Sequence, residues 1–300
     1  MDSRLEHVNC NLCGANDYSV VYPALSGKST SEADFSASGN DVLTDQVVKC
    51  KQCHFVYVNP RLKSQFIVGG YSAAEDKTYV SQSEGRMATF RAGVRLMEKH
   101  MPKKGRVLDV GAAAGLFVKA AKENGWDAYG VEPSHWLARY GRETFGLNLK
   151  QGTIHTAKYP DAHFDVVTFW DVLEHVPDPA ADLKEAMRIL KPGGLLVVNY
   201  PNFGSRLAKI TGRKWWFLLS VHLWYFTPKT MRDMLERNGF EQVYSKRHYQ
   251  KLSLGYLVYR VQPYNKAIHR VLNALVSALR LQDQQVTYYA SQYLVLARKK

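Results

Sequence analysis

The stretch VLDVGAAAGLF, residues 107–117, decides how the rest of this 300-residue chain is interpreted. Its apolar residues are typical of a buried strand, and they lead into a glycine, three alanines and a second glycine. Small residues at the end of a strand let a ligand approach the backbone closely. The stretch therefore predicts a strand, a tight turn that holds a ligand, and a helix that begins with the final Leu and Phe.

Strands and helices alternate from this stretch to the end of the chain. The apolar patterns predict strands at 106–111, 127–132, 147–152, 164–170, 195–200, 240–246 and 287–298, and helices at 116–124, 135–145, 179–190 and 231–238. Thr227 and Pro228 add a start signal to the last of these helices. This alternation predicts an α/β fold in which a doubly wound, mostly parallel sheet of seven strands is covered on both faces.

Another helix is expected before the first of these strands, at residues 81–101. Ser81 and Glu84 have the spacing of a capping box. The apolar stripe that follows them repeats at helical spacing and consists of Met87, Phe90, Val94, Met97 and Met101.

All four cysteines fall into two pairs, Cys10 with Cys13 and Cys50 with Cys53. Two CxxC pairs suit the tetrahedral coordination of zinc by thiolates, and four sulfur ligands leave no open position for water. Two redox dithiols are the alternative, but they would need a strand–helix context that neither pair has. We therefore expect a structural Zn²⁺ in a small ribbon, with a polar, turn-rich insertion at 26–41 between the pairs.

The net charge of +13 is concentrated in one third of the chain. Residues 186–282 hold sixteen Lys and Arg but three acids, an excess of 16 − 3 = 13. Such a field attracts a phosphate-bearing substrate, an anionic membrane surface or nucleic acid. A basic face without any partner is the alternative. Because no nucleic-acid recognition motif accompanies the charge, we do not expect nucleic acid as the partner.

The composition excludes two classes of protein. With 46% hydrophobic and 22% charged residues the chain is typical of globular proteins and not of disordered ones. The longest uncharged apolar run, WWFLLSV at 215–221, is too short to span a membrane. The first ten residues lack the apolar core of a secretory signal, so we expect a cytoplasmic location.

The ligand of the turn at 111–115 follows from two residues. Glu132 ends the second strand, 21 residues after Gly111, where its carboxylate can accept hydrogen bonds from both hydroxyls of a ribose. A dinucleotide would need the middle glycine of GxGxxG, and Ala113 stands there instead. Ala113 leaves less room for a diphosphate but enough for an amino-acid group and a sulfonium.

Five motifs strengthen this interpretation because they occur together and in order. They are VLDVGAAAG, GVEPS, FDVVTFWDVLEHVPDP, ILKPGGLLVVNYPN and HLWYFTPKTMRDMLERNGF. With them the chain, up to about residue 245, resembles the class I S-adenosylmethionine-dependent methyltransferases. It is most similar to a subgroup that carries an N-terminal four-cysteine zinc domain. The resemblance implies a Rossmann-like methyltransferase fold.

The resemblance also implies roles for individual residues of the cofactor site. It places Asp109, Gly111, Ala113 and Gly115 around the methionine part of the cofactor, and Glu132 and Pro133 at the ribose and adenosine. It places Thr153 and Ile154 near the adenine, and Trp170 and Asp171 over the cofactor. Tyr71 and Tyr79 are expected to fold over the site, although both could be ordinary surface aromatics.

Methyl transfer from a sulfonium requires an acceptor held in line, and a hydroxyl acceptor also requires a base. The resemblance places His175 on the substrate side, and His222 converges on the same edge of the sheet. We expect His175 to be the base and His222 to be the second candidate, with Glu174 and Tyr225 as orienting groups. For each histidine the alternative is a structural hydrogen bond at a loop corner.

Two further segments have open interpretations. The aromatic stretch GRKWWFLLSVHLWYF, residues 212–226, is expected to form a substrate floor beside Arg213 and Lys214, with burial in the core as the alternative. Residues 266–280 predict a basic amphipathic helix inserted before the last strand. We expect this helix to pack on its own domain; capping the active site, binding a partner helix and lying on the inner membrane surface are the alternatives.

Together these features predict an enzyme with four segments. They are a zinc-binding ribbon at 1–65, a helical linker or cofactor lid at 66–102, a methyltransferase core at 103–250, and a helical cap with the final strand at 251–300. The expected reaction is methylation of a hydroxyl on a nucleotide- or lipid-linked saccharide in cell-envelope glycan or natural-product synthesis. The alternatives are C-methylation of a keto-sugar, O-methylation of an aromatic or quinone precursor, and a non-catalytic protein that binds through its zinc and basic surfaces.

Overall fold

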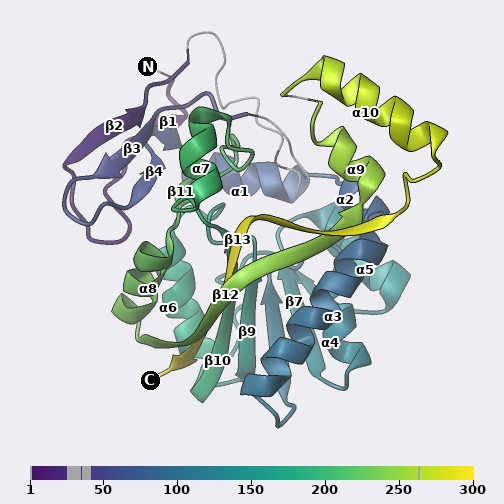
Figure 1. The fold of residues 1–300 in the computed structure, drawn as a ribbon. Coiled ribbons are helices and arrows are strands. Elements are labelled where there is room, and N and C mark those ends of the chain that lie inside the picture. Colours follow the sequence, from purple (N-terminus) through teal and green to yellow (C-terminus); the bar gives the residue numbers. More distant parts are fainter. Residues whose placement is uncertain (1, 26–34, 36–41, 263) are drawn as a thin grey trace.

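A computed structural model describes residues 2–25, 35, 42–262 and 264–300 of the chain. Most of the insertion expected at 26–41 therefore lies outside the described residues. The central element is a sheet of seven strands in the order β12-β13-β10-β9-β6-β7-β8 (Figure 1). Its strands are β6 (Arg106–Val110), β7 (Asp127–Glu132), β8 (Asn148–Gln151), β9 (Phe164–Trp170), β10 (Leu190–Pro201), β12 (Phe240–Ser253) and β13 (Gln285–Lys299).

The strand pairing confirms the predicted doubly wound, mostly parallel sheet. β10, β9, β6, β7 and β8 pair in parallel, whereas β13 pairs antiparallel with both β10 and β12. β6 lies between β9 and β7, so the strand order reverses at the end of the VLDVG strand. This is the switch point at which open α/β sheets bind their ligands.

Helices cover both faces of the sheet, as the alternation predicted (Figure 1). One face carries α3 (Ser83–His100), α4 (Leu116–Glu123) and α5 (His135–Phe145), and the other carries α6 (Pro179–Ile189) and α8 (Pro228–Arg237). Val94, Phe117 and Leu137 belong to the first apolar core, and Leu183 and Leu235 belong to the second. Thr227 caps α8 as expected, because its side chain accepts the backbone N–H of Thr230.

The start expected for α3 is wrong. Ser81 is the last residue of a separate short helix, α2 (Lys77–Ser81), and Gln82 stands between α2 and α3. Asp76 starts α2 by accepting the backbone N–H of Tyr79 at 2.6 Å. α2 ends at Ser81, whose hydroxyl donates back to the Thr78 carbonyl oxygen and not forward to α3.

The N-terminal part of the chain forms a second, small sheet with the order β11-β4-β3-β2. Its strands are β2 (Tyr18–Tyr22), β3 (Val47–Cys50), β4 (Val56–Val58) and β11 (Trp224–Tyr225), and β1 (Leu5–Glu6) pairs separately with β5 (Arg61–Leu62). β11 comes from the aromatic stretch after β10 and pairs antiparallel with β4. The ribbon expected over 1–65 is therefore completed by two residues from the distant core segment.

The remaining elements lie at the carboxyl end of the parallel strands, around the switch point (Figure 1). They are α1 (Ser64–Ala73) and α2 in the segment before the core, α7 (Arg206–Thr211) with a 3₁₀ turn (Gly212–Lys214) after β10, and α9 (Leu254–Tyr259) and α10 (Lys266–Ala278) between β12 and β13. None of the helices in the described part of the chain is both long and apolar enough to cross a membrane.

Candidate functional site

A cavity of about 360 Å³ lies over the carboxyl ends of β6, β7 and β9. Most of the residues predicted for the cofactor line it, and they come from strand ends that are distant in sequence. From the predicted set the lining includes Asp109, Gly111, Ala113, Glu132, Pro133, Thr153, Ile154, Trp170, Asp171, Tyr71, Tyr79 and His175. One cavity thus joins the expected cofactor residues to the expected base.

Gly115 does not belong to this lining, and its expected contact with the cofactor is wrong. It has a φ of +77° at the start of α4, and a Cβ there would lie 2.6 Å from a methyl carbon of Leu147. Gly115 therefore shapes the turn and permits close packing of the start of α4 against β8. The missing side chain faces the protein interior and not the cavity.

The turn at 111–113 uses its backbone to hold an acid. Gly111 and Ala113 have φ angles of +67° and +46°. The N–H of Ala113 donates to Glu132 Oε2 at 2.7 Å, and the N–H of Ser134 donates to Glu132 Oε1 at 2.7 Å. An amide that a diphosphate would need is thus already bound to a carboxylate, which would also repel an anion. The geometry supports a nucleoside with its ribose at Glu132 over a dinucleotide.

Two buried acids make the cavity receptive to a cation. Burial raises the pKa of Glu132 to about 7, against bonds from two backbone amides that lower it. Burial also raises the pKa of Asp109 to about 8, although the hydroxyl of Thr168 donates to Asp109 Oδ1 at 2.6 Å. A positively charged ligand would stabilise both carboxylates in their ionised form. The sulfonium and ammonium groups of S-adenosylmethionine fit this requirement.

Asp171 and Trp170 form the wall of the cavity at the end of β9. Asp171 has a φ of +54°, and its Oδ1 accepts bonds from Asn199 at 2.7 Å and Gln292 at 2.6 Å. The Trp170 ring packs close to α3, where a Cβ on Gly93 would lie 2.8 Å from it. Gly93 therefore lets α3 approach and fix the position of the indole.

The helices before the core, in the segment predicted as a lid, contribute side chains to the cavity lining. Tyr79 of α2 is buried, and the Arg86 guanidinium of α3 lies 4.1 Å from the centre of its ring. Tyr71 of α1 reaches the other end, where its hydroxyl lies 2.7 Å from His175 Nδ1. Neither tyrosine is an ordinary surface aromatic.

His175 belongs to a compact cluster with Glu174 and His222. Its Nδ1 also lies 3.1 Å from the Val221 carbonyl oxygen, and the two imidazole rings are 4.5 Å apart. One nitrogen or oxygen atom from each of the three side chains lies within 4.8 Å of the others, an arrangement that could also surround a metal ion. Neither carboxylate oxygen of Glu174 has a hydrogen-bond partner among the described residues.

Burial determines the charge of this cluster. It lowers the pKa of His175 to about 4 and lowers the pKa of His222 well below its usual value. It also raises the pKa of Glu174 well above its usual value. Both imidazoles are therefore neutral near pH 7. Within the cluster His175 lines the cavity, whereas Glu174 and His222 lie behind it. The prediction of His222 as a base in contact with substrate is wrong for this reason.

Tyr225 is not part of the site. It lies in β11, and its fully buried ring packs at 5.4 Å from Phe203, in the apolar cluster that joins the small sheet to α7. β11 consists of Trp224 and Tyr225 and pairs with β4, which places the Tyr225 ring in this apolar cluster and outside the cavity lining. The prediction that Tyr225 orients groups in the site is therefore wrong.

The expected aromatic substrate floor is also wrong. Trp215, Trp224 and Phe226 are fully buried and line no part of the cavity. Trp224 stacks on Phe55 of the ribbon, with ring centres 5.8 Å apart and planes within 3°. Arg213 contacts Tyr22 and the Pro23 carbonyl instead of a ligand. The alternative interpretation, burial in the core, is the correct one, since these rings fill the interface between the two sheets.

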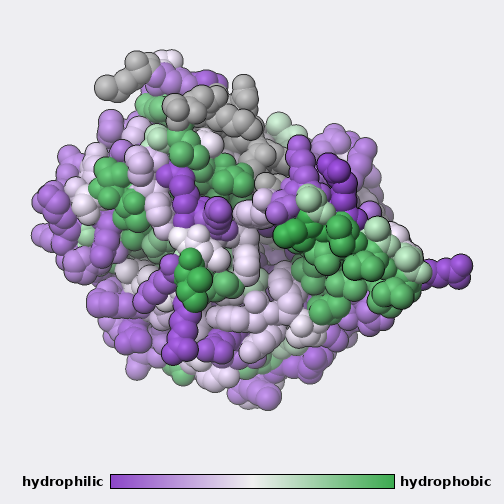
Figure 2. Space-filling model, turned by 45° about the horizontal axis from the view of Figure 1, so that its top comes forward, coloured by the Kyte–Doolittle hydropathy of each residue, from purple (hydrophilic) through white to green (hydrophobic). Residues whose placement is uncertain are grey.

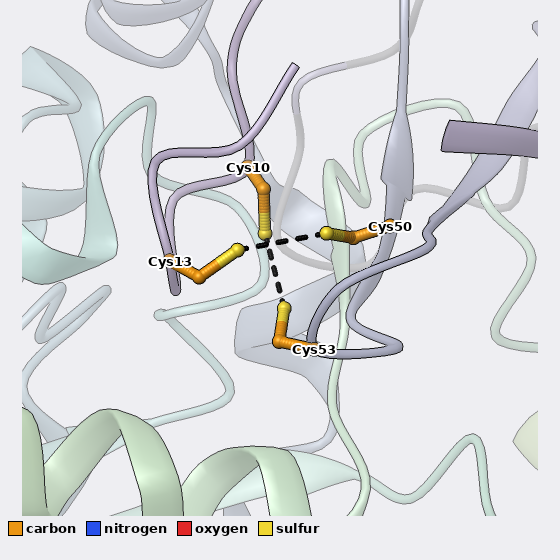
Figure 3. Close-up of side chains that lie close together, drawn as sticks. All are labelled: Cys10, Cys13, Cys50 and Cys53. Carbon is orange, nitrogen blue, oxygen red and sulfur yellow. Dashed lines mark hydrogen bonds between the residues drawn. The ribbon is translucent and has the colours of Figure 1, made fainter. Parts of the chain in front are cut away.

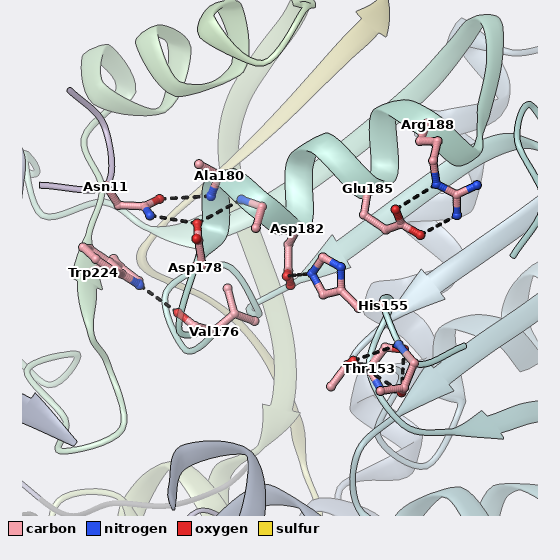
Figure 4. A network of polar contacts seen from close by, with 12 residues as sticks. Asn11, Thr153, His155, Val176, Asp178, Ala180, Asp182, Glu185, Arg188 and Trp224 are labelled. Atoms are coloured by element: carbon pink, nitrogen blue, oxygen red, sulfur yellow. Dashed lines mark hydrogen bonds and ion pairs between the residues drawn. The ribbon is translucent and has the colours of Figure 1, made fainter. Parts of the chain in front are cut away.

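This interface also holds the loop that carries His175 (Figure 4). Trp224 Nε1 donates to the Val176 carbonyl oxygen at 2.8 Å. Arg61 of β5 donates to the Pro177 carbonyl oxygen at 2.6 Å. Asn11, between the first two cysteines, donates to Asp178 at 2.8 Å and accepts the N–H of Ala180 at 3.0 Å. The ribbon therefore contacts three consecutive residues directly after His175.

The four cysteines converge as the spacing predicted (Figure 3). The Sγ atoms of Cys10 and Cys53 are 3.4 Å apart, and those of Cys13 and Cys50 are 3.5 Å apart. All four sulfurs lie within 4.8 Å of one another. Four thiolates at about 2.3 Å from a tetrahedral zinc ion would be separated by a little under 4 Å. The donor set and its spacing therefore fit Zn²⁺.

Several cavity residues were not predicted from the sequence. Arg86 and Thr89 come from α3, and His248, Gln250 and Lys251 come from the second half of β12. Thr89 joins the two elements, because its hydroxyl accepts the backbone N–H of Lys251 at 2.8 Å. No local pattern marks these residues, since β12 extends well beyond the strand expected at 240–246.

Comparison with known proteins agrees with this geometry. Residues 79–245 match a family model described as a methyltransferase domain, which is more than half of the chain. The chain belongs to this family. Its core is an S-adenosylmethionine-dependent methyltransferase domain. The match covers α3, the strands from β6 to β10 and the histidine cluster, whereas the cysteine ribbon, α1, α9 and α10 lie outside it.

Among curated proteins, the methyltransferase domain is similar to ubiquinone biosynthesis O-methyltransferases. The protein of that name from Cereibacter sphaeroides is 31% identical over 150 residues, which are 46% of this chain and 61% of the relative. The one from Roseobacter denitrificans is 31% identical over 155 residues, 47% of this chain and 62% of the relative. The chain thus spans about three fifths of the length of these relatives.

The fold of this chain is also similar to the folds of solved methyltransferase structures. A SAM-dependent methyltransferase from Archaeoglobus fulgidus superposes with a TM-score of 0.52 at 19% identity, covering 75% of this chain and all of that protein. At this identity the likeness concerns the fold alone.

Proposed function

We propose that the protein transfers the methyl group of S-adenosylmethionine to a hydroxyl oxygen of an acceptor bound beside His175. The observation that carries this proposal is the single cavity that joins Asp109 and Glu132 to His175. A donor held at the two acids and an acceptor held at the imidazole would share one enclosed space. The similarity to two O-methyltransferases supports oxygen as the receiving atom.

The residues at the Asp109 and Glu132 end of the cavity would hold the cofactor. S-Adenosylmethionine supplies a methyl group that is already activated for an in-line displacement. Glu132 would hold the ribose hydroxyls, and Asp109 would face the charged amino-acid part of the cofactor. Tyr79 and Arg86 would exclude water from above. Holding donor and acceptor in line is the main contribution that such a site can make.

His175 would accept the proton of the acceptor hydroxyl. The neutral imidazole is the form that can take up a proton, and burial keeps His175 in that form. Tyr71 and the Val221 carbonyl hold the ring from its Nδ1 side. His222 would then act through this cluster as a positioning residue.

The acceptor is proposed to be a hydroxylated, largely apolar ring compound. The cavity wall near His175 is made of apolar and aromatic side chains, namely Phe35, Ile67, Val68, Tyr71 and Val176. The aromatic stretch and Arg213, on which the saccharide prediction rested, lie elsewhere. We therefore favour the alternative of O-methylation of an aromatic or quinone precursor.

Two measurements test the proposal. Calorimetry should detect S-adenosylmethionine binding by the wild type, and absence of binding at millimolar cofactor would favour the non-catalytic alternative. Labelled cofactor should then transfer its methyl group to members of a panel of phenols and catechols. Transfer to sugar nucleotides or lipid-linked sugars instead would return the acceptor to the saccharide class.

The variant His175→Ala separates chemistry from binding. Loss of a general base typically lowers the rate by a factor of about 10² to 10⁴. We expect a decrease of that size in kcat with nearly unchanged cofactor affinity, because His175 lies away from Glu132 and Asp109. Unchanged turnover in this variant would contradict the role of His175.

We also propose that the cysteine site holds a structural zinc ion. With all four positions taken by sulfur, the ion would brace the ribbon and take no part in methyl transfer. The purified protein should contain about one equivalent of zinc by mass spectrometry, and Cys10→Ser with Cys13→Ser should contain none. Retention of zinc by that double variant would contradict the assignment.

A further inference from the structure

Helix α10 exposes an apolar face that the described residues of the chain leave uncovered. Ile268, Val271, Leu275 and Leu279 are 51%, 61%, 53% and 65% exposed. They lie on one side of the helix, with Lys266, Arg270, Asn273 and Ser277 on the other. Figure 2 shows the result as a continuous hydrophobic patch on the face of the molecule that holds α9 and α10. The expectation that this helix packs on its own domain therefore holds only in part, because these four side chains are left exposed.

The helix is anchored by other residues, so its apolar face is available. Val276 is buried, and α9 is the described element against which α10 mainly packs. The side chain of Asn265 caps the helix by accepting the N–H groups of Ala267 and Ile268 at 3.0 Å. An exposed row of large aliphatic side chains on an otherwise well-formed helix is a sign of an interaction surface.

The charge of the surrounding segment indicates what covers this face. Residues 242–282 contain seven Lys and Arg and no Asp or Glu. A second copy of the chain would bring the same basic segment against itself, and the like charges would oppose pairing. An anionic lipid surface offers both complements, an apolar boundary for the aliphatic side chains and phosphate groups for the cations.

We propose that α10, together with the adjacent α9, docks on the surface of an anionic phospholipid bilayer. The helix would lie in the plane of the interface with its aliphatic side chains below the headgroups. Exposed Tyr259 and Tyr264 next to α10 suit the headgroup region, where aromatic rings with a polar tip are favoured. The protein would bind at the surface without crossing the bilayer.

Once α9 and α10 are docked, they would lie next to the entrance of the methyl-transfer cavity. Lys251 and Leu252, which line the cavity, come directly before Ser253 and α9. Ser253 donates to Gln82 Oε1 at 2.9 Å, so the cap is tied to the start of α3 in the lid. An apolar acceptor could thus enter from the bilayer; this consequence, unlike the docking itself, rests on the proposed function.

Vesicle sedimentation tests the docking without any need for activity. The wild type should bind vesicles of phosphatidylcholine with about 30% phosphatidylglycerol, and should bind pure phosphatidylcholine at least tenfold more weakly. The variant Val271→Asp with Leu275→Asp places two charges on the apolar face and should lose at least tenfold in affinity. Each of these side chains adds to the affinity by leaving water, so two charges at these positions remove that contribution.

The matched control is Asn273→Asp with Ser277→Asp, which makes the same change in net charge on the opposite face. It should retain most of the binding. Equal losses in both variants would mean attraction by charge alone and would overturn the docking geometry. Wild-type protein that binds neither vesicle would also overturn the proposal, as would a dimer in light scattering that the apolar-face variant dissociates. Unchanged cofactor affinity by calorimetry would show that each variant is folded.

Discussion

Replacing Asn11 by Ala should slow methyl transfer although this residue lies in the cysteine ribbon, away from the cavity. The Asn11 side chain makes two hydrogen bonds to the loop after His175, at 2.8 Å to Asp178 and at 3.0 Å from Ala180. Asp178 also caps α6 by accepting the N–H of Ala181. The Asn11 amide thus holds one end of the segment that begins at the proposed base.

The size of the effect follows from these two bonds. Each hydrogen bond of this kind contributes about 0.5–1.5 kcal/mol, and these two belong to the lower part of that range because both are at least partly exposed to water. Their loss would therefore weaken the docking of the loop by about 1–2 kcal/mol. A change of that size lowers the ratio of docked to undocked loop by a factor of about 5 to 30. Trp224 and Arg61 still hold the Val176 and Pro177 carbonyls, so the loop would loosen without detaching.

The assay compares turnover with cofactor binding. Under saturating substrates kcat of Asn11→Ala should fall about 5- to 30-fold, whereas the Kd for S-adenosylmethionine and the zinc content should stay within a factor of two of the wild type. Asn124→Ala is the matched control, because Asn124 also donates to a backbone carbonyl, that of Ala120, at the far end of α4. A normal kcat for Asn11→Ala, or an equal decrease in the control, would refute the bracing role of the ribbon.

Three further predictions concern stability. Burial raises the pKa of Glu132 from 4.5 to about 7, so its protonated form stabilises the ligand-free fold at low pH and this contribution is lost as pH rises through 7. The free energy of unfolding, measured by urea titration, should therefore decrease between pH 5 and pH 8. Glu132→Gln should remove up to about 3 kcal/mol of that decrease. Gly93→Ala places a carbon 2.8 Å from the Trp170 ring, so it should lower the free energy of unfolding by about 1–3 kcal/mol in the same titration and should also lower the affinity for the cofactor. Gly69→Ala is the control, because open space surrounds that position, and it should change neither quantity. Cys50→Ser should lower the zinc content and the melting temperature together, and a normal melting temperature without zinc would contradict the structural role of the ion.

Local patterns in the sequence were sufficient for the elements of the core. The strands 127–132 and 164–170 and the helix 135–145 occur with the predicted bounds, because each pattern of apolar residues follows the period of the element it forms. The turn after β6 and the convergence of Glu132 on it were predictable for a related reason. Parallel strands place their carboxyl ends at one edge, so residues that follow them must lie close together. The cysteine pairs needed only their spacing.

Contacts between distant segments were decided by the tertiary structure alone. An apolar pattern shows that a side chain avoids water but not what it packs against, so Trp224 was expected in a substrate floor and lies instead against Phe55 of the ribbon. The same uncertainty applies to α10, whose pattern is equally compatible with a covered and with an exposed apolar face. Arg86 and Gln250 enter the cavity because α3 and β12 cross above it, which depends on helix packing and strand length and not on any local signal.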